Sequence, residues 1–172
     1  MHWIVIAAVL AAIALSVVVA TWIGRHLPEA HQATVKTRLD ASPARIWSLI
    51  TNFADAPNWR SGLRQVERLA DRDGLPVWVE VHRRRRQPLA FEQVDPPHRL
   101  VLRSDGDELA FAGTWTFELA AEGDGTELTI HEAGLIRPPF LRFMARYVFG
   151  YDGAMKRYLR DLGRKVALPK AR

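Results

Sequence analysis

Residues 110–136, AFAGTWTFELAAEGDGTELTIHEAGLI, contain two alternating segments joined by a turn. In 110–119 the aromatic side chains stand at every second position, which indicates a β-strand with one buried face. The sequence EGDG at 122–125 supplies glycines for a tight turn, and 126–136 alternates again. The stretch therefore predicts an antiparallel hairpin whose aromatic face packs against the helical region that follows.

The chain upstream of this hairpin consists of short segments with the same alternation. Ser42-Pro43 is typical of a helix start, because a hydroxyl caps the first turn and proline fits the first helical position. Pro57 ends this helix, and a second short helix begins close to it. We expect strands at 33–40, 62–70, 75–86, 88–94 and 99–104, with turns at 71–74, 95–97 and 105–107.

Downstream of the hairpin, Pro138-Pro139 ends the last strand and begins a region with helical periodicity. We predict one long amphipathic helix over 139–166 that covers one face of an antiparallel sheet, an α+β fold, with a cavity between them if the sheet curls. Gly150 and Gly153 each weaken that helix by about 1 kcal/mol relative to alanine. They mark a kink or a close approach by ligand or strand, or they are simply tolerated. The predicted apolar face comprises Phe140, Met144, Tyr147, Val148, Tyr151, Met155, Tyr158, Leu159, Leu162 and Val166.

Near the beginning of the chain, residues 3–23 (WIVIAAVLAAIALSVVVATWI) carry no charge. As a helix this run is about 31 Å long, the thickness of a bilayer's hydrocarbon core. Trp3 and Trp22 suit the two membrane interfaces. A cleaved secretory signal is the alternative, but the run is longer than a signal's apolar region and no lysine or arginine precedes it. We expect an uncleaved, single-pass membrane anchor, and the basic residues that follow it favour a soluble domain on the cytoplasmic side.

The composition suits one domain beside a membrane. Lysine and arginine number 24 against 19 acidic residues, a net charge of +5. This surplus fits attraction to anionic lipid better than to nucleic acid, because no basic motif with interleaved aromatics is present, or it serves only solubility. Cysteine is absent, which excludes disulfide and thiol chemistry. We expect an anchor at 1–24, a linker at 25–32, a domain at 33–168 and a basic tail at 169–172.

Several short motifs occur in an order that resembles a known superfamily. They are DASP at 40–43, IWSLI at 46–50, VDPPHRL at 94–100, GTWTF at 113–117 and GTELT at 125–129, followed by the C-terminal helix. In this order they resemble the SRPBCC or START-like (Bet v 1-like) superfamily, and within it the polyketide cyclase/dehydrase-type branch. The resemblance implies a helix-grip fold, in which a curved antiparallel sheet of about six to seven strands wraps around the long C-terminal helix and leaves an apolar pocket. Members of the superfamily are lipid and hydrophobic-ligand carriers, aromatase/cyclases and regulators, so the fold alone selects no chemistry.

A pocket for a hydrophobic ligand needs apolar walls and a few polar groups. Glu132 falls among apolar neighbours on 126–136, so its carboxylate needs a partner or a proton. It is either a polar handle and weak catalytic candidate in a pocket, or it pairs with a neighbouring arginine or lies near solvent at the strand end. For each aromatic candidate, ordinary core packing is the alternative. The ligand-binding residues we expect are Trp59, Trp78, Phe91, Phe111, Trp115, Phe117, Glu132, Met144, Tyr147 and Tyr151.

Other site chemistries find no support in the sequence. The histidines lack metal-ligand spacing, and neither a nucleophile elbow nor a phosphate-binding glycine loop is present. We expect no metal, no cofactor and no nucleic acid partner. Four consecutive arginines form the strongest charge cluster and fit either anionic lipid headgroups or a solvated strand end that blocks edge pairing. They are Arg83, Arg84, Arg85 and Arg86.

These patterns favour a membrane-anchored, non-enzymatic module that binds a hydrophobic small molecule or lipid between sheet and helix. One alternative is a polyketide cyclase/dehydrase-like enzyme that uses Glu132 and a helix tyrosine as acid and base. The other is a cavity-less domain that interacts with another protein.

Overall fold

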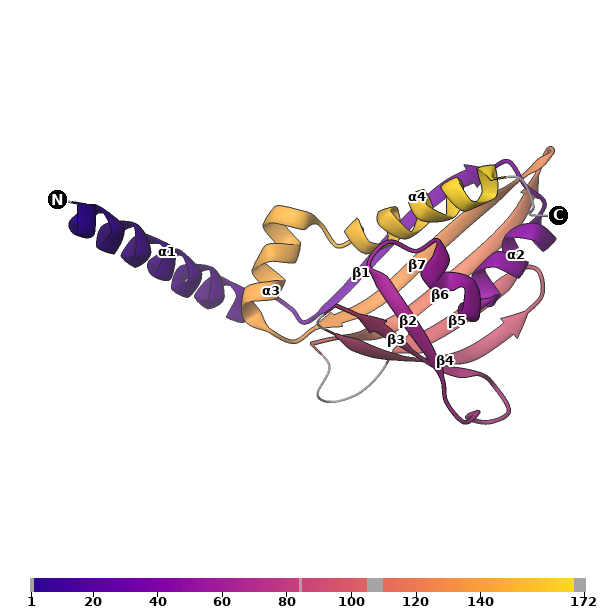
Figure 1. Cartoon of the computed structure of the whole chain (residues 1–172), viewed down its shortest axis with the longest axis horizontal. Helices are drawn as coiled ribbons and strands as arrows, with labels where there is room; N and C mark the ends of the chain where they lie inside the picture. The colour runs from indigo at the N-terminus through magenta and orange to yellow at the C-terminus, as the bar shows by residue number, and fades with distance from the viewer. Residues whose placement is uncertain (1, 84, 105–109, 169–172) are drawn as a thin grey trace.

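A seven-stranded antiparallel sheet forms the centre of the computed structural model, which describes residues 2–83, 85–104 and 110–168 (Figure 1). Its order is β1-β7-β6-β5-β4-β3-β2, so the first and last strands are neighbours. The predicted turn at 105–107, the basic tail and Arg84 lie outside the described residues. The strands are β1 (Ala30–Leu39), β2 (Leu63–Arg68), β3 (Val77–His82), β4 (Arg86–Asp95), β5 (Arg99–Ser104), β6 (Phe111–Glu122) and β7 (Gly125–Ile136).

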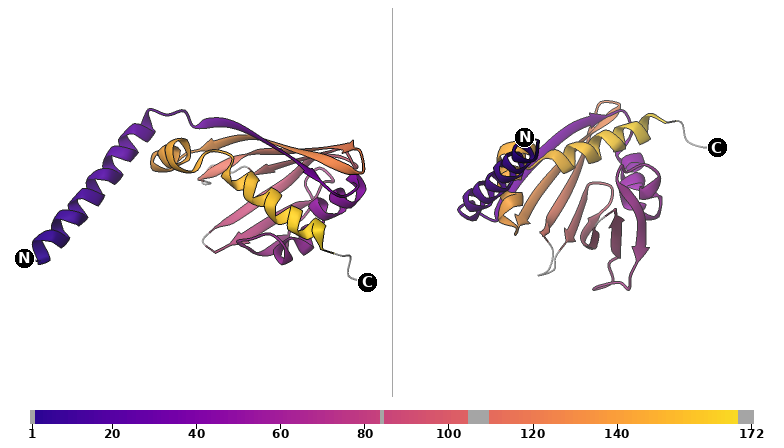
Figure 2. Two further views of the ribbon diagram at one scale, coloured as in Figure 1. Left: turned by 90° about the horizontal axis from the view of Figure 1, so that it is seen from above. Right: turned by 60° about the vertical axis from the view of Figure 1, so that its left-hand side comes forward.

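The predicted hairpin is β6 and β7. Trp115 pairs with Glu132 and Phe117 pairs with Ile130, so the aromatic face of β6 lies beside the inward face of β7. The sheet curves, and its concave face holds the core (Figure 2). The predicted α+β helix-grip architecture with a curved antiparallel sheet is confirmed.

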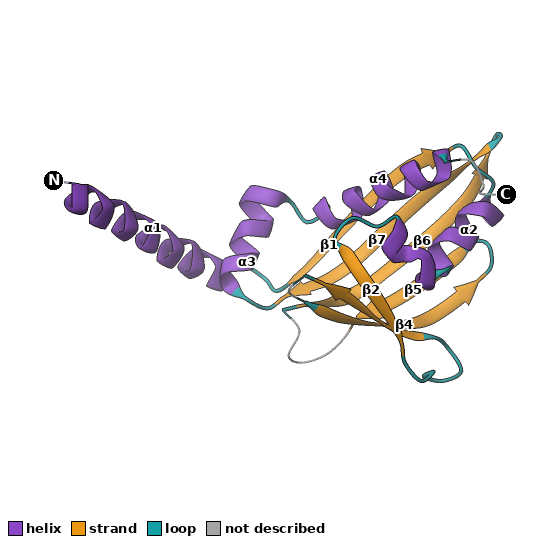
Figure 3. Ribbon diagram, viewed as in Figure 1, coloured by secondary structure: helices purple, strands orange, loops and turns teal. Residues whose placement is uncertain are grey.

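Two short helical segments cover part of the concave face (Figure 3). They are α2 (Pro43–Thr51) and η1 (Phe53–Asn58). The Ser42 hydroxyl accepts a hydrogen bond from the Arg45 backbone N–H, as the predicted cap requires. Ile46, Ile50 and Phe53 then reach the core cluster of the sheet.

The C-terminal region is not one long helix. It comprises α3 (Pro139–Met144), a π-helical turn η2 (Ala145–Phe149) and α4 (Gly153–Ala167). Gly150 separates η2 from α4 with φ 75°, a left-handed conformation that an α-helix does not contain. The prediction of a single helix face over 139–166 is therefore wrong, and the kink interpretation of Gly150 is correct. Of these three C-terminal segments, α4 lies along the concave face, whereas α3 packs against the N-terminal helix (Figure 1).

Within the described residues, Arg83 and Arg85 of the arginine cluster lie in the connection between β3 and β4 rather than in a strand. The strand predicted for 75–86 ends at His82, and Arg86 begins β4. Arg86 pairs with Glu67 on the neighbouring β2, and the Arg85 guanidinium lies over the Phe111 ring at 5.6 Å. The expected contact of these arginines with anionic headgroups stays a prediction.

The N-terminal helix α1 (His2–Arg25) projects away from the domain (Figure 1). It is long and apolar enough to cross a membrane by length and composition, with a mean hydropathy of 2.9. Its large side chains face outward; Trp3 is 84% and Leu10 is 61% exposed. We call the end of the sheet from which it projects the α1 end; β1 begins there at Ala30, within the predicted linker, and β7 ends there at Ile136.

Candidate functional site

The space directly beneath α4 is filled by aromatic and aliphatic side chains. Tyr158 of α4 contacts the rings of Trp59, Trp115 and Phe117, with centroids 5.5 to 5.9 Å apart. Met155 of α4 is fully buried in the same core. We expected a cavity between this helix and the sheet. Instead, the Tyr158 ring and the Trp59 indole, which comes from the end of η1, pack against each other in that space.

A second aromatic group lies under α2 and η1. Phe53 stacks on Trp78 at 5.8 Å and contacts Phe91 at 5.2 Å. Phe91 is buried, whereas Trp78 is half-buried. The structure thus brings together Trp59, Trp115 and Phe117 in one group and Trp78 and Phe91 in another, each joined by a ring that we did not select as a candidate.

At the α1 end the concave face is less covered, because α4 begins only at Gly153. Trp115 and Phe111 are half-buried there. Tyr151, in the connection before α4, stacks on His31 of β1 with centroids 4.6 Å apart and planes 17° apart. We define the α1-end site as the group of His31, Trp115, Glu132 and Tyr151.

Glu132 faces inward as predicted, and its partner is a histidine rather than an arginine. Its Oε1 lies 3.9 Å from His31 Nε2, and 9% of the His31 side chain and 18% of the Glu132 side chain remain exposed. His31 Nδ1 is buried without a hydrogen-bond partner within the described residues. The contact with Glu132 leaves Nδ1 of this ring available to a polar group placed against it.

Two paired glycines make room for this ring. Gly113 of β6 pairs with Gly134 of β7, and a Cβ on Gly134 would overlap the His31 imidazole. A Cβ on Gly113, whose φ is 141°, would overlap the backbone carbonyl of Ala133. The glycines therefore let the three strands β6, β7 and β1 approach closely while His31 lies across them.

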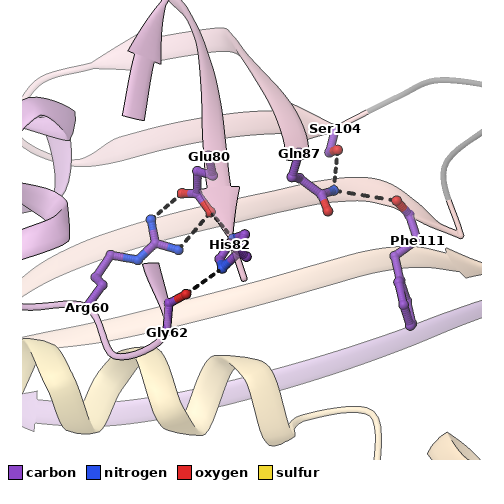
Figure 4. Close-up of polar contacts among 7 residues, drawn as sticks. All are labelled: Arg60, Gly62, Glu80, His82, Gln87, Ser104 and Phe111. Atoms are coloured by element: carbon purple, nitrogen blue, oxygen red, sulfur yellow. Dashed lines mark hydrogen bonds and ion pairs between the residues drawn. The ribbon is translucent and has the colours of Figure 1, made fainter. Parts of the chain in front are cut away.

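A buried charged group lies across the sheet from this site (Figure 4). The Arg60 guanidinium binds both carboxylate oxygens of Glu80, with Nη2–Oε2 at 3.1 Å. His82 places Nε2 at 3.2 Å from Glu80 Oε2 and Nδ1 at 3.1 Å from the Gly62 carbonyl oxygen. Both ring nitrogens face acceptors, so His82 satisfies both partners when each nitrogen carries a proton.

Electrostatics keep this group ionised. Burial disfavours the Glu80 carboxylate, but the charges and hydrogen bonds of Arg60 and His82 outweigh it, so the pKa of Glu80 lies below its usual value. Burial likewise raises the pKa of Tyr158 well above that of an exposed tyrosine. Tyr158 therefore stays neutral beneath the Arg60 guanidinium, which lies 5.1 Å from its ring centroid.

Neutral polar side chains extend this group along β4 and β5. The Gln87 Nε2 amide donates to the Ser104 hydroxyl and, at 3.5 Å, to the Phe111 carbonyl (Figure 4). Both side chains lie on the inward face at the α1 end. This end of the concave face is consequently polar, whereas the core beneath α2 is apolar.

Two predicted site residues lie elsewhere. Met144 of α3 lines a groove against α1, and Tyr147 of η2 is exposed. Conversely, our selection missed His31, Arg60 and Glu80. His31 continues the alternation of β1 beyond its expected start, a signal that could have identified it. The pairing of Arg60 with Glu80 has no sequence signal, because it depends on how η1 leads into β2.

The described residues contain no cluster of three or more histidine and acidic side chains that could hold a metal ion. Their chemistry offers general acid–base groups and hydrogen-bond donors beside aromatic surfaces.

We compared the chain with known protein families, with curated proteins and with solved structures. Residues 30–167 match a family model described as polyketide cyclase/dehydrase and lipid transport. A search of curated proteins found no match to the sequence.

Solved structures of similar fold include proteins with quite different names. A START superfamily protein from Mycobacterium smegmatis is similar with a TM-score of 0.64 and 16% identity, covering 79% of this chain and 97% of that one. The ZhuI aromatase/cyclase from Streptomyces sp. R1128 has a TM-score of 0.66 and 12% identity, over 80% and 93%. Norcoclaurine synthase from Thalictrum flavum has a TM-score of 0.64 and 14% identity, over 82% and 96%. At these identities the likeness establishes the fold alone.

Proposed function

Because this chain belongs to the polyketide cyclase/dehydrase and lipid transport family, we propose that it is a membrane-anchored binding module for a hydrophobic small molecule or lipid. The ligand lies on the α1 end of the concave face, against Trp115, His31 and Tyr151. The helix α1 holds this site beside the membrane, with the domain on the cytoplasmic side.

The observation that carries the proposal is a half-open aromatic face with an unpartnered polar atom. Trp115 and Phe111 are half-buried, while His31 Nδ1 is buried with no hydrogen-bond partner among the described residues. A buried donor or acceptor without a partner costs about 1–3 kcal/mol. An apolar molecule with one or two polar groups would cover the rings and provide a partner for this nitrogen.

The anchoring part rests on the exposure of α1. Within the described residues, only Ala20 and Gly24 of this helix are buried. Side chains such as Ile4 and Leu10 are more than half exposed. In water, the exposure of apolar surface costs about 25 cal/mol per Å² of free energy. A bilayer removes this cost, and Ser16 and Thr21 satisfy their hydroxyls on carbonyls of the same helix.

Native mass spectrometry of the full chain, released from detergent micelles in the gas phase, tests the binding function. We expect a retained mass of a few hundred daltons at one copy per chain, lost in Trp115→Ala. Trp22→Ala is the matched control, because this tryptophan lies on α1 and would affect only lipid held by the anchor. A chain without any retained molecule, or with one that depends on Trp22 and not on Trp115, contradicts the proposal; a co-purifying protein alone would indicate an interaction domain.

One observation favours a second candidate, an acid–base enzyme of the cyclase/dehydrase kind. Glu132, His31 and Tyr151 come together from β7, β1 and the connection before α4. In such an enzyme Glu132 and His31 would move a proton at the ligand while Tyr151 positions the imidazole. Glu132→Gln would then abolish conversion of the retained molecule, whereas a carrier would still retain it unchanged.

A further inference from the structure

We propose that α3 and η2 lie in the lipid bilayer beside α1, so that the chain enters the membrane at two places and lipid hydrocarbon fills the groove between them. This inference rests on the proposed anchoring of α1. Its consequence is that the α1-end site, whose Tyr151 stands two residues after the end of η2, takes its ligand from the bilayer rather than from water.

The first argument is the contact between α1 and α3. Ala20 and Gly24, four residues apart, are the buried positions of α1, and small residues at this spacing let two helices approach closely in membranes. A Cβ on Gly24 would overlap the carbonyl of Pro139, where α3 begins. Because α3 packs directly on α1, the medium that surrounds the C-terminal half of α1 also surrounds α3.

The second argument is the groove between the two helices. It has a volume of about 460 Å³ and extends along α1 from Val9 to Ala20. Phe140, Phe143 and Met144 form its other wall, and Ser16, its one hydroxyl, is bonded to a carbonyl of its own helix. This apolar groove lies beside the middle of the α1 span, so it suits lipid acyl chains and offers no free hydrogen-bonding group to a polar partner.

The third argument is the exposed face of η2. Tyr147, Val148 and Phe149 are 59%, 56% and 67% exposed, three consecutive large apolar side chains in the turn that directly follows α3. Exposed apolar clusters of this kind mark contact surfaces. Because η2 continues the chain from α3, which packs on α1, this exposed face favours the same lipid environment over a separate protein partner.

The fourth argument is the arrangement of charges. The segment 139–149 contains two arginines and no acidic residue. Arg142 is buried and pairs with Glu29, with Nη1–Oε1 at 3.1 Å, so this charge is neutralised at the base of α1 rather than facing hydrocarbon. Arg146 is exposed, and its long side chain can reach anionic headgroups.

Lipid quenching in the full chain tests the inference, and the natural absence of cysteine makes single labelling sites simple to introduce. Val148→Cys, Leu10→Cys and Leu69→Cys are labelled with the fluorophore NBD and reconstituted into vesicles of phosphatidylcholine and phosphatidylglycerol that contain doxyl-labelled lipid. Leu69 is the matched control, an exposed leucine in the β2–β3 connection on the far side of the domain from α1 (Figure 1).

We expect quenching at Val148 comparable with that at Leu10, and none at Leu69. Quenching at Leu10 without quenching at Val148 overturns the inference and leaves the anchor intact. Absence of quenching at Leu10 overturns the anchor and the inference together. A Val148 label protected from both doxyl lipid and aqueous iodide indicates a protein partner and also overturns it.

A second variant tests the geometry that places α3. Gly24→Leu should push α3 away from α1 and reduce quenching of the Val148 label, with the Leu10 label unchanged. Equal quenching of the Val148 label with and without Gly24→Leu would show that the α1–α3 contact does not position η2.

Discussion

Arg60 and Glu80 form a two-pronged ion pair that joins the end of η1 to β3 at the α1 end of the concave face. The Arg60 side chain is 18% exposed and that of Glu80 is 5% exposed, so water contributes little to either charge. The pair also holds the guanidinium over Tyr158, the ring that fills the space beneath α4. Loss of either partner leaves a buried charge that the rest of the domain must accommodate.

Glu80→Gln keeps the side-chain shape but removes the charge that balances Arg60. We expect the free energy of unfolding to fall by about 3–5 kcal/mol, the usual cost of leaving a buried charge unpaired. Urea unfolding of the full chain in detergent, followed by tryptophan fluorescence, measures this change. Glu67→Gln is the matched control, because Glu67 pairs with Arg86 at the exposed outer face and its loss should have little effect. Equal effects of the two variants would contradict the role assigned to burial.

The pKa of Glu80 predicts acid sensitivity. The pKa of this carboxyl is about 4.5 in the unfolded chain and lower in the folded chain. The carboxylate therefore stabilises the fold at a pH above 4.5, and this contribution is lost as the pH falls through the pKa of the folded chain. Unfolding free energies between pH 7 and pH 3 should therefore decline for the wild type and decline less steeply for Glu80→Gln. Parallel curves would show that Glu80 does not contribute to the acid response.

Tyr158 predicts the opposite behaviour in alkali. Burial raises its pKa above 10, so the folded chain keeps the phenol neutral while the unfolded chain ionises. The corresponding stability is complete below pH 10 and is lost as the pH rises above it. Between pH 8 and pH 11 the wild type should lose stability faster than Tyr158→Phe. Tyr147→Phe, at the exposed position, should follow the wild type.

Gly134→Ala tests the α1-end site. The added methyl group would overlap the His31 imidazole and displace it from Tyr151, whereas stability should change little because a side-chain ring can move. We expect altered His31 imidazole signals in NMR spectra and loss of the retained ligand. Gly153→Ala is the control, since nothing lies within 4 Å of its added carbon. An unaffected His31 signal with full ligand retention would exclude this ring from binding.

Local patterns predicted most of the secondary structure. Alternation in 110–136 predicted β6 and β7, and Ser42-Pro43 predicted the start of α2, because both signals depend on neighbouring residues. The prediction failed where packing between distant segments intervenes. Helical periodicity continues across 139–166, but Gly150 interrupts the helix. As a result α3 packs on α1, whereas α4 packs on the sheet, in place of the single helix that we predicted.

The candidate site was predicted only in part. Glu132 and Trp115 were found because strand alternation shows which side chains face inward. His31 was assigned to a linker, although it continues the inward series of β1 and forms the partner of Glu132. Met144 and Tyr147 were expected to contact the ligand, but Met144 lies against α1 and Tyr147 is exposed.

The sequence by itself determined the apolar N-terminal helix, the alternating strands and the order of elements that makes a helix-grip fold, because each depends on periodicity within a short stretch. Only the tertiary structure decided which charges are paired, which rings fill the space beneath α4, and which end of the concave face stays open. Those outcomes depend on contacts between residues far apart in the chain, such as Arg60 with Glu80, His31 with Tyr151 and Gly24 with Pro139. No local pattern encodes such contacts, since they arise only when the sheet has curved and the chain has closed upon it.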